Sequence, residues 1–545
     1  MKIYIKKGLV IFGLLATVFT FFAFRTDYFE IAKQLEIYST LFKELNMNYI
    51  DEINPAELTE TAIDNMLDEL DPYTKFYDEQ GVEDAKINAT GDFSGIGAST
   101  KFIDNKFFIY ELFKDLPAEK AGIKVGDEII QVNGLEVKEG NIQEISSLMQ
   151  GAEGSAIDLQ ILRQNNKLEF NVERTKIEAD PVPHYQMIDD KIGYIAFSRF
   201  NSKGSKAIKN AFEDLKDAGM DRLVLDLRDN PGGLLNEAVD ITNFFIPKGE
   251  VVVTTKGKLT KLSETYRTKN EPIDTEIPIV VLIDRNSASA SEIVAGSLQD
   301  LDRAVVMGDR SFGKGLVQRY IDLSYGTKLK ITISKYYTPS GRNIQELDYT
   351  HRSGRDVPKF SEEKRNSFKT KNGRTVYDGG GIEPDIKLSK QKETLSTEAL
   401  LESDLIFSYV NNYYYSHPSI ANPEDFKLTS SDYEDFIKFV SENSSKFKIQ
   451  SEKIFDAGIV ASEKEDYKDF ISPEIKSLNQ KIQKKKLQEL EINKILIMQE
   501  LSDEIIKRYY FEKGTYQNHL YKSPYVQEAV SLLKDLDRYK KILKP

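Results

Sequence analysis

The chain has 545 residues, of which 40% are hydrophobic and 30% charged, and it carries a formal net charge of −13. A chain of this length is expected to form about three or four folded domains. The acidic balance argues against nucleic acid as a partner, because binding phosphate groups requires a clustered basic surface. Cysteine is absent, which excludes disulfides, thiolate nucleophiles and cysteine-bound metals. We expect neither a metal site nor a cofactor.

The N-terminus has the composition of an export signal. Lys2, Lys6 and Lys7 precede an uncharged apolar run over 8–24, and a basic start before such a run keeps the lysines in the cytoplasm. The run is at the short limit for spanning a bilayer, and no clear cleavage site follows it. For residues 1–26 we favour an uncleaved signal anchor over a removed signal peptide, with a buried N-terminal helix as the third alternative.

No later stretch is apolar enough to span a membrane. The rest of the chain is therefore predicted to be exported and soluble within the cell envelope. In a bacterium with two membranes, this means the periplasmic side of the inner membrane.

Residues 27–88 have a helical pattern. Apolar side chains such as Ile31 and Leu35 recur with a spacing near 3.6 residues. The pattern resumes after Pro55 and ends at a turn signal that begins with Asp71. We expect an N-terminal helical region here.

Residues 89–175 change to short strands. The segments 107–110 and 128–132 have strand composition, and Asn133-Gly134 is typical of a hairpin turn. A second strand pair is expected over two further segments, 157–163 and 167–174. The sequence predicts a small strand-rich module.

Residues 176–395 alternate between strands and helices. The apolar runs 223–227 and 277–283 are typical of strands buried on both faces. A helix-like segment follows each run, over 234–245 and 291–298. This alternation predicts a layered α/β core.

Residues 396–545 are expected to be helical and rich in Lys, Glu and Tyr. The stretch 481–508 has amphipathic spacing and a strongly charged face. We interpret the run Lys484-Lys485-Lys486 as part of a solvated face.

The stretch 286–318 is the most informative for chemistry. A strand ends before it, small residues follow, and a helix is expected near Ser291. A serine on such a strand-to-helix turn is held rigidly near outward-pointing N–H groups. Ser287, Ser289 and Ser291 all compete for this role, and the alternative is that all three are turn or helix-capping serines.

A lysine between two glycines follows the serine run. Gly313-Lys314-Gly315 places the lysine on backbone that is entropically costly to order, which favours a specific task for it. The alternative is a phosphate-binding loop, since Gly308, Gly313 and Lys314 match the first fixed positions of the Walker pattern. Gly315 lacks the hydroxyl that this pattern needs for Mg²⁺, which argues against that alternative.

Several motifs occur in a specific order along the chain. They are DPYTKFYD (71–78), a glycine-containing module (about 89–175), GYIAFSRF (193–200), LVLDLRDNPGG (223–233), NSASASEI (286–293), RSFGKGLVQ (310–318), YYTPSGRNIQ (336–345) and GIEPDI (381–386). In type and order they resemble the carboxyl-terminal processing peptidases, or tail-specific proteases. The resemblance implies a layered α/β protease core with an inserted PDZ-like domain, an N-terminal helical segment and a C-terminal helical extension.

The resemblance also implies a catalytic pair. The family's nucleophile falls on Ser289, its general base on Lys314, and Gln318 is similar to the residue that orients the lysine. A lysine acts as a base only when neutral, so its pKa must fall well below the usual value of about 10.4, and burial in an apolar pocket has that effect.

An oxyanion needs backbone donors near the nucleophile. The N–H of Ala290, directly after Ser289, is the natural first donor. The second is implied by the resemblance to be Gly232 or Gly233, and the alternative is that this Gly-Gly pair forms an ordinary turn.

Other catalytic groups fit the sequence less well. The chain has four histidines, and none of them lies in a matching motif; they are His184, His351, His417 and His519. A carboxylate-pair hydrolase would use Asp226 and Asp229, which we interpret instead as support for their loop.

A glycine-containing loop near residue 95 resembles the carboxylate-binding loop of a PDZ domain. Successive N–H groups of such a loop form a nest for a terminal carboxylate, and the adjoining strand edge pairs with the peptide. The alternative is a PDZ fold that binds no tail. The expected tail-binding residues are Phe93, Ser94, Gly95, Ile96 and Gly97.

One departure from the family pattern concerns regulation. Family members often carry a basic residue directly before the position of Gly151, and here the residue is Gln150. Activation through tail binding is therefore absent here or uses another residue.

Two functions follow from these observations. The first is a serine endopeptidase that processes or degrades exported proteins and recognises their C-terminal tails. The second is a catalytically silent PDZ scaffold in the cell envelope. The C-terminal helices are expected to support self-association into a homo-oligomer.

Overall fold

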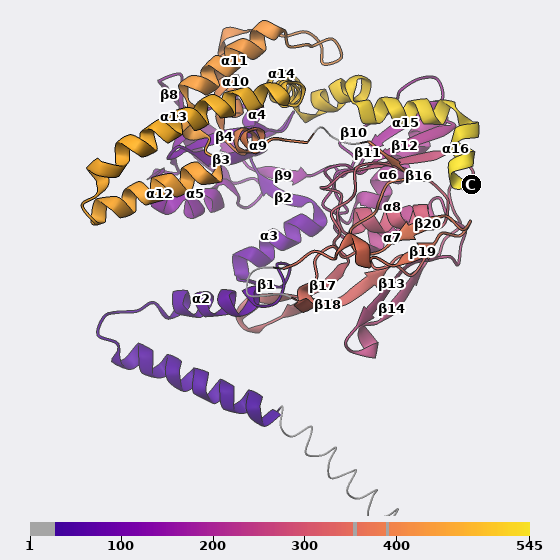
Figure 1. The fold of residues 1–545 in the computed structure, drawn as a ribbon, viewed down its shortest axis with the longest axis horizontal. Helices are drawn as coiled ribbons and strands as arrows, with labels where there is room; N and C mark the ends of the chain where they lie inside the picture. The colour runs from indigo at the N-terminus through magenta and orange to yellow at the C-terminus, as the bar shows by residue number, and fades with distance from the viewer. Residues whose placement is uncertain (1–27, 352–356, 389–391, 545) are drawn as a thin grey trace, which may run out of the picture. The chain divides into compact units, whose positions relative to one another are not determined.

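The computed structural model describes residues 28–351, 357–388 and 392–544, and Figure 1 shows its elements along the chain. The chain divides into two units, Met1–Phe76 and Tyr77–Pro545. The predicted anchor over 1–26 lies outside the described residues. Among the helices that the structure describes, none is long and apolar enough to cross a membrane.

The N-terminal unit is helical, as the apolar spacing predicts. Residues 28–48 form one helix, and α2 (Pro55–Asp68) follows. The side chain of Asn54 caps α2 by accepting a backbone hydrogen bond. Asp71 then accepts two backbone hydrogen bonds and closes the predicted turn. Strand β1 (Lys75–Tyr77) spans the chain position where the two units join.

The strand-rich module of the second unit is an antiparallel sheet with the strand order β3-β4-β5-β7-β8, and β6 pairs with β5. The predicted Asn133-Gly134 turn joins β5 to β6. A buried cluster that includes Ile109, Ile129 and Ile161 fills the module. The elements are β3 (Ala98–Ile103), β4 (Lys106–Leu112), α4 (Pro117–Lys120), β5 (Glu128–Val132), β6 (Leu135–Glu136), α5 (Ile142–Met149), β7 (Ala156–Arg163) and β8 (Asn166–Glu173).

A short ribbon closes the module at its two chain ends. Helix α3 (Glu79–Thr90) leads into β2 (Asp92–Gly95), which pairs antiparallel with β9 (Thr175–Glu178). The chain therefore enters and leaves the module through adjacent strands.

The layered core is built on a sheet with the strand order β10-β11-β12-β15-β16-β21. β10 is antiparallel to β11, and the remaining neighbours are parallel. The apolar runs of the sequence form its central strands, as predicted. The strands are β10 (His184–Met187), β11 (Ile192–Ala196), β12 (Arg222–Asp226), β15 (Ile279–Ile283), β16 (Val305–Gly308) and β21 (Ile386–Lys387).

Helices cover both faces of this sheet (Figure 1). On one face pack α6 (Gly204–Asp217), α7 (Leu235–Asn243) and α8 (Ala290–Asp300). On the other pack α15 (Pro524–Lys534) and α16 (Leu536–Leu543), with buried Leu532, Leu533 and Tyr539 against the strands. The last helices of the predicted C-terminal extension thus complete the core, which the sequence analysis did not predict.

A second sheet stands beside the core. Its strands β17, β18, β13 and β14 are antiparallel, and within the described chain β17 pairs with β18 alone. A short hairpin of β19 and β20 lies further along the chain. The strands are β13 (Val251–Gly257), β14 (Glu264–Arg267), β17 (Leu316–Asp322), β18 (Lys328–Tyr337), β19 (Ser367–Lys369) and β20 (Thr375–Tyr377).

The remaining helices form a separate cluster with its own buried core. The predicted single stretch 481–508 is two helices that break at Asn493, whose buried side-chain oxygen accepts hydrogen bonds from Thr394 and Thr397. The helices are α9 (Leu395–Leu401), α10 (Leu405–Ser416), α11 (Ser430–Glu442), α12 (Gln450–Lys464), α13 (Lys468–Ile492) and α14 (Lys494–Lys522).

The solvated-face interpretation of the lysine run is wrong for one residue. Lys484 and Lys485 are exposed, but Lys486 is buried. Its ammonium lies 2.8 Å from a carboxylate oxygen of Glu452 and 3.9 Å from the ring centroid of Phe447. The carboxylate compensates the burial of the charge, so the residue belongs to the helix packing.

Candidate active site

The candidate active site forms where three neighbouring parallel strands end. β12, β15 and β16 lie side by side, so the loops that follow them meet at one edge of the sheet. These loops carry the Gly232-Gly233 turn, the serine run that includes Ser289, and the glycine-flanked Lys314. The fold therefore gathers three motifs that are far apart in the sequence.

Ser289 lies at the junction of β15 and α8, with a φ of 55° and a ψ of −109°. A positive φ is strained for a residue with a side chain and persists where the surrounding structure enforces it. The competing serines are buried and bound to backbone: Ser287 Oγ donates to the carbonyl of Leu227, and Ser291 Oγ donates to that of Asn230. Of the three serines, Ser289 is the one that lines the cleft.

A buried carboxylate ties the serine turn to the lysine turn. Glu292 accepts hydrogen bonds from the N–H groups of Ser289 (2.8 Å) and Lys314 (3.0 Å). It also accepts bonds from the N–H of Gly313 (2.7 Å) and from Ser311 Oγ (2.6 Å). Burial raises the pKa of Glu292 to about 6, and these hydrogen bonds oppose the rise because they favour the ionised form.

The sequence analysis missed Glu292. Its signal was present, because Ser289 and Glu292 have the Ser-x-x-Glu spacing of a capping box. The spacing predicts the bond from Glu292 to the N–H of Ser289, which the structure contains. It does not predict the second set of donors, since these come from a turn beyond the next strand.

The lysine turn has two further anchors. The N–H of Gly315 donates to Gln345 Oε1 at 2.8 Å, and its carbonyl accepts from the N–H of Tyr336. The N–H of Phe312 donates to the carbonyl of Ser287. The turn that carries Lys314 is thereby fixed to both the serine run and β18.

Ser289, Lys314 and Gln318 all line one cleft of about 560 Å³. The amide nitrogen of Gln318 donates to Thr332 Oγ1 at 3.1 Å. The cleft is lined by Ala85, Asn88, Ala89, Arg199, Phe200, Pro231, Gly232, Gly233, Leu234, Leu235, Ser289, Ala290, Ile293, Lys314, Leu316, Val317, Gln318, Arg319, Tyr320, Lys330 and Tyr336. The residues of the predicted catalytic pair and both glycines therefore share one cavity.

The glycine turn lies directly against the nucleophile turn. A methyl group on Gly232 would lie 2.5 Å from the carbonyl oxygen of Ala288 and 2.8 Å from the amide nitrogen of Ala290. Gly232 also has a φ of +93°, a conformation that favours glycine. A residue with a side chain would push the two turns apart.

The backbone donors near Ser289 are not equivalent. The N–H of Gly232 is occupied, since it donates to Asn230 Oδ1 at 2.9 Å. The carbonyl of Gly232 accepts from the N–H of Phe200, so the N–H of Gly233, on the opposite side of the same planar peptide, points away from Phe200. In the described part of the chain, the N–H groups of Gly233 and Ala290 donate to no protein atom.

Asp226 and Asp229 do not form a catalytic pair. Asp226 is buried and accepts hydrogen bonds from Tyr194 and from the guanidinium of Arg228. Asp229 accepts a hydrogen bond from Asn286 and so holds two loops together. Both carboxylates support the loop, as expected.

Histidine is absent from the residues that line the cleft in the described chain. His184 is buried in β10, beside β11, and burial lowers its pKa. In the described ranges, no three His, Asp or Glu side chains come together in a way that could hold a metal ion.

The expected carboxylate loop adjoins an open strand edge. Phe93, Ser94 and Gly95 lie in β2 and pair with β9. The carbonyls of Ile96 and Gly97 accept hydrogen bonds from the N–H groups that follow β4. β3 begins directly after this loop, and in the described chain it pairs with β4 alone, so its outer edge is open.

The neighbourhood of Gln150 contains a basic side chain from elsewhere. The guanidinium of Arg174 packs against Gly151, where a Cβ atom would lie 2.9 Å from its Nε. It donates to the carbonyls of Leu148 and Ala156 and to Ser155. Arg174 therefore fixes the end of α5 and is committed to backbone within the module.

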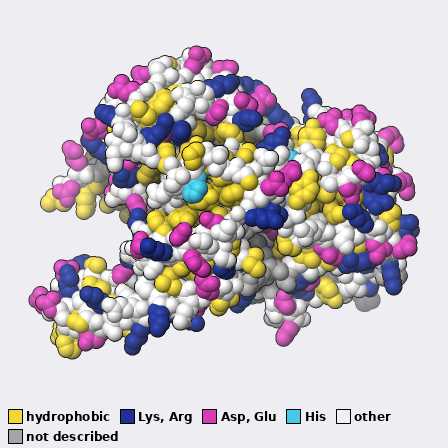
Figure 2. Space-filling view, turned by 90° about the horizontal axis from the view of Figure 1, so that it is seen from above, with side chains coloured by type: hydrophobic (Ala, Val, Ile, Leu, Met, Phe, Trp, Pro, Cys, Tyr) yellow, Lys and Arg dark blue, Asp and Glu magenta, His cyan; other side chains and the backbone are white. Residues whose placement is uncertain are grey.

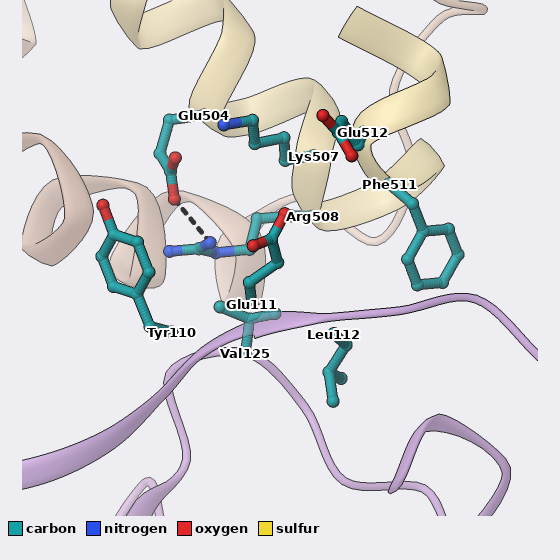
Figure 3. A pocket seen from close by; sticks show the side chains of 9 residues that line it. All are labelled: Tyr110, Glu111, Leu112, Val125, Glu504, Lys507, Arg508, Phe511 and Glu512. Carbon is teal, nitrogen blue, oxygen red and sulfur yellow. Dashed lines mark hydrogen bonds and ion pairs between the residues drawn. The ribbon is translucent and has the colours of Figure 1, made fainter. Parts of the chain in front are cut away.

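Two further cavities lie away from Ser289, between the strand-rich module and α14. The smaller has a volume of about 30 Å³ and is lined by β4, Val125 and α14 (Figure 3). In it, Arg508 forms an ion pair of 2.6 Å with Glu504, while Lys507, Glu111 and Glu512 lie close by. The larger has a volume of about 800 Å³ and reaches Phe93.

Sequence profiles of three known families match the chain. Peptidase family S41 matches residues 191–350, and a PDZ domain matches residues 109–163. The profile named "Probable PDZ-protease, C-terminal helical domain" matches residues 396–533.

Curated relatives match the protease part of the chain. A carboxy-terminal-processing protease of Bartonella bacilliformis is 36% identical over 324 residues, which cover 58% of this chain and 74% of the relative. A probable CtpA-like serine protease of Staphylococcus haemolyticus is 36% identical over 308 residues, which cover 56% of this chain and 61% of the relative.

Solved structures of similar proteins include a photosystem II D1 C-terminal processing protease. It is 26% identical, with a TM-score of 0.37, and the match covers 64% of this chain and 86% of that one. The PDZ domain of a carboxy-terminal protease from Vibrio cholerae, in complex with a peptide, is 26% identical with a TM-score of 0.15. That match covers 16% of this chain and 99% of that one.

The fold and the matched domains define the class as a serine peptidase that carries a PDZ domain and a C-terminal helical domain. Within that class, the chain belongs to the carboxy-terminal-processing proteases of peptidase family S41.

Proposed function

We propose that the chain is an active serine endopeptidase in which Ser289 is the nucleophile and Lys314 is the general base. The observation that carries this proposal is the shared anchor Glu292, which binds the backbone of both residues beside one cleft. A scaffold that only binds peptides has no need for this connection.

The reaction follows the two-step course of acyl transfer. Ser289 Oγ attacks the carbonyl carbon of the scissile peptide bond, and Lys314 Nζ accepts the hydroxyl proton. When the C–N bond breaks, Lys314 returns this proton to the leaving amine. Water then attacks the acyl-enzyme by the reverse proton path and regenerates Ser289.

The oxyanion of each tetrahedral intermediate needs donors that are otherwise free. Ala290 and Gly233 supply N–H groups beside Ser289, whereas the N–H of Gly232 is held by Asn230. We assign the oxyanion hole to Ala290 and Gly233. Gln318 lines the same cleft and orients the amine of Lys314 in this mechanism.

The substrates in this proposal are exported proteins with accessible C-terminal tails. The loop of Phe93, Ser94, Gly95, Ile96 and Gly97 receives the tail carboxylate, and the open edge of β3 pairs with the tail. Residues 1–26 direct the chain to the cell envelope and attach it to the membrane.

The test compares hydrolysis of an unfolded protein by the purified wild-type chain and four serine or lysine variants. We expect Ser289→Ala and Lys314→Ala to abolish turnover, while Ser287→Ala and Ser291→Ala retain it because neither residue lines the cleft. Equal turnover by Ser289→Ala and wild type would overturn the assignment. No turnover by wild type, with tail peptides still bound, would favour the scaffold.

A further inference from the structure

The charged side chains of the catalytic cleft are all basic. Arg199, Lys314, Arg319 and Lys330 line it, and no Asp or Glu does in the described chain. This composition is unusual for a protein whose net charge is −13. On the face shown in Figure 2, by contrast, acidic and basic side chains are interspersed.

Three of the cleft cations have no carboxylate partner in the described chain. In the part of the chain that the structure describes, Arg199, Arg319 and Lys330 form no ion pair. Arg199 donates to the neutral side chain of Asn88, and Lys330 lies 5.9 Å from the ring centroid of Tyr320.

Another lysine on the same strand, Lys328, has a carboxylate partner. Lys328, two residues before Lys330 on β18, lies 2.9 Å from a carboxylate oxygen of Asp322. Lys328 does not line the cleft. The hairpin therefore compensates a cation outside the cleft and leaves the cation inside it available.

The hairpin geometry places Lys330 along the path of a substrate. In the β17–β18 ladder, Gln318 is opposite Thr332 and Tyr320 is opposite Lys330. Side chains alternate along a strand, so Gln318, Tyr320 and Lys330 share one face. Lys330 thus lies about two residues, or roughly 7 Å, further along the hairpin than Gln318.

An extended peptide can reach this lysine from Ser289. β17 pairs with β18 alone in the described chain, so its other edge can add a substrate strand. A peptide on this edge would pass Gln318 and then Tyr320, and the long side chain of Lys330, opposite Tyr320 on the same face, can reach toward it. Arg199 approaches the cleft from the segment after β11 and so flanks the peptide from another element.

We propose that the cleft selects protein segments that carry Asp or Glu within a few residues of the scissile bond, and that Lys330 and Arg199 bind these carboxylates. This inference rests on the proposed peptidase function and specifies its substrate class. Arg319 also lines the cleft and adds to its positive field.

The expected preference is moderate because the cations are partly solvated. Exposed ion pairs contribute little and are screened by salt. One Lys330–carboxylate pair is expected to change kcat/KM by about two- to fivefold, which corresponds to the usual range for such pairs. Two pairs together are expected to reach about tenfold.

The test uses matched peptides that differ at one position beside the cleaved bond, with Glu, Gln or Lys there. We expect wild-type kcat/KM to fall in the order Glu, Gln, Lys at low salt, and the differences to shrink at high salt. Lys330→Glu should reverse the order, and Arg199→Gln should reduce the spread. Lys328→Glu is the matched control and should keep the wild-type order.

Cleavage of the neutral Gln peptide tests the peptidase proposal itself, whereas the differences among the three peptides test the charge preference. If no peptide is cleaved, the peptidase proposal fails, and binding of the same labelled peptides to Ser289→Ala, measured by fluorescence anisotropy, still tests the charge preference. Equal kcat/KM for the three peptides at low salt, or an order that Lys330→Glu leaves unchanged, would overturn the inference. Equal affinity of Ser289→Ala for the three peptides would also overturn it.

Discussion

The catalytic cleft and the small cavity beside α14 differ in the charged side chains that line them. The cavity of Figure 3 brings Arg508 and Lys507 together with Glu504, Glu111 and Glu512. The cleft contains cations and no carboxylate in the described chain. Where cations and carboxylates occur together, they join two parts of the protein, and where cations occur without carboxylates, Arg199 and Lys330 remain available for a ligand.

The pKa shifts agree with this contrast. Burial raises the pKa of Glu111. Burial opposes the charge of Lys507, but nearby Glu504 and Glu111 raise its pKa overall. Neighbouring carboxylates therefore stabilise the charge of Lys507, whereas burial outweighs the charged neighbours of Glu111 and Arg508 and shifts both pKa values toward the neutral form. The carboxylate of Glu292, which adjoins the serine and lysine turns of the cleft, is buried and accepts hydrogen bonds from four donors.

Removing Glu292 is expected to have the largest effect, because it would release both turns of the cleft. Glu292→Ala would leave several buried donors without an acceptor, at about 1–3 kcal/mol each. We expect the free energy of unfolding to fall by about 3–5 kcal/mol and kcat to fall by about 10²-fold or more. Urea unfolding and steady-state kinetics measure both effects. A variant with wild-type kcat would show that Glu292 does not position the pair.

Replacing Gly232 by alanine tests whether close packing against the serine turn, and not only the positive φ of the glycine, matters for catalysis. Gly232→Ala would collide with the nucleophile turn and displace the donor at Gly233, so kcat should fall by about 10²–10³-fold. Gly249 has the same φ of +93° but no atom within 4 Å of the added methyl group. Gly249→Ala is therefore the control and should cost about 1 kcal/mol of stability with kcat unchanged. Similar kinetics for the two variants would contradict this account of the cleft.

Removing one charge of an ion pair in the cavity beside α14 should affect stability more than catalysis. Glu504→Gln would leave the buried guanidinium of Arg508 without its charged partner. We expect the free energy of unfolding to fall by about 3 kcal/mol. Asp404→Asn breaks the more exposed pair with Lys101 and should cost under about 1 kcal/mol. Chemical unfolding measures both. An equal effect of the two changes would show that burial does not distinguish these pairs.

A smaller effect than the loss of Glu504 is expected for the pH dependence of stability through Glu292. Its folded pKa of about 6 lies above the ordinary value of 4.5. The folded state therefore binds the proton more tightly, and the contribution of Glu292 to stability is present below pH 4.5 and lost as the pH rises through 6. Relative to Glu292→Gln, wild type should lose about 1–2 kcal/mol over this interval. A constant difference between the two proteins would contradict the raised pKa.

Local sequence patterns were enough to predict many elements of the fold. The apolar runs became buried strands, and Asn133-Gly134 formed its hairpin turn. The pattern could not show that α15 and α16 cover the central sheet, because an amphipathic helix does not specify which surface it covers. The burial of Lys486 could not be predicted for the same reason, because its partner Glu452 lies on another helix.

The candidate site could be predicted only in part, because some of its features depend on contacts between distant segments. Three serines at alternate positions are chemically alike in the sequence; the family resemblance selects Ser289, and the contacts of Ser287 and Ser291 supply the physical reason. The strain within α14 at Phe511, which has a φ of 59°, also depends on tertiary packing, because its ring contacts the core of the strand-rich module. Such features arise from segments that meet only in the folded chain.

The most direct test of the catalytic pair is to identify the residue that is acylated during turnover. The chain is mixed with an activated peptide ester, quenched in acid, and analysed by intact and fragment mass spectrometry. We predict one acyl group per chain on Ser289, absent from Ser289→Ala and formed at least about 10³-fold more slowly in Lys314→Ala. An acyl group on a different hydroxyl, or acylation that is undiminished in Ser289→Ala, would contradict the account.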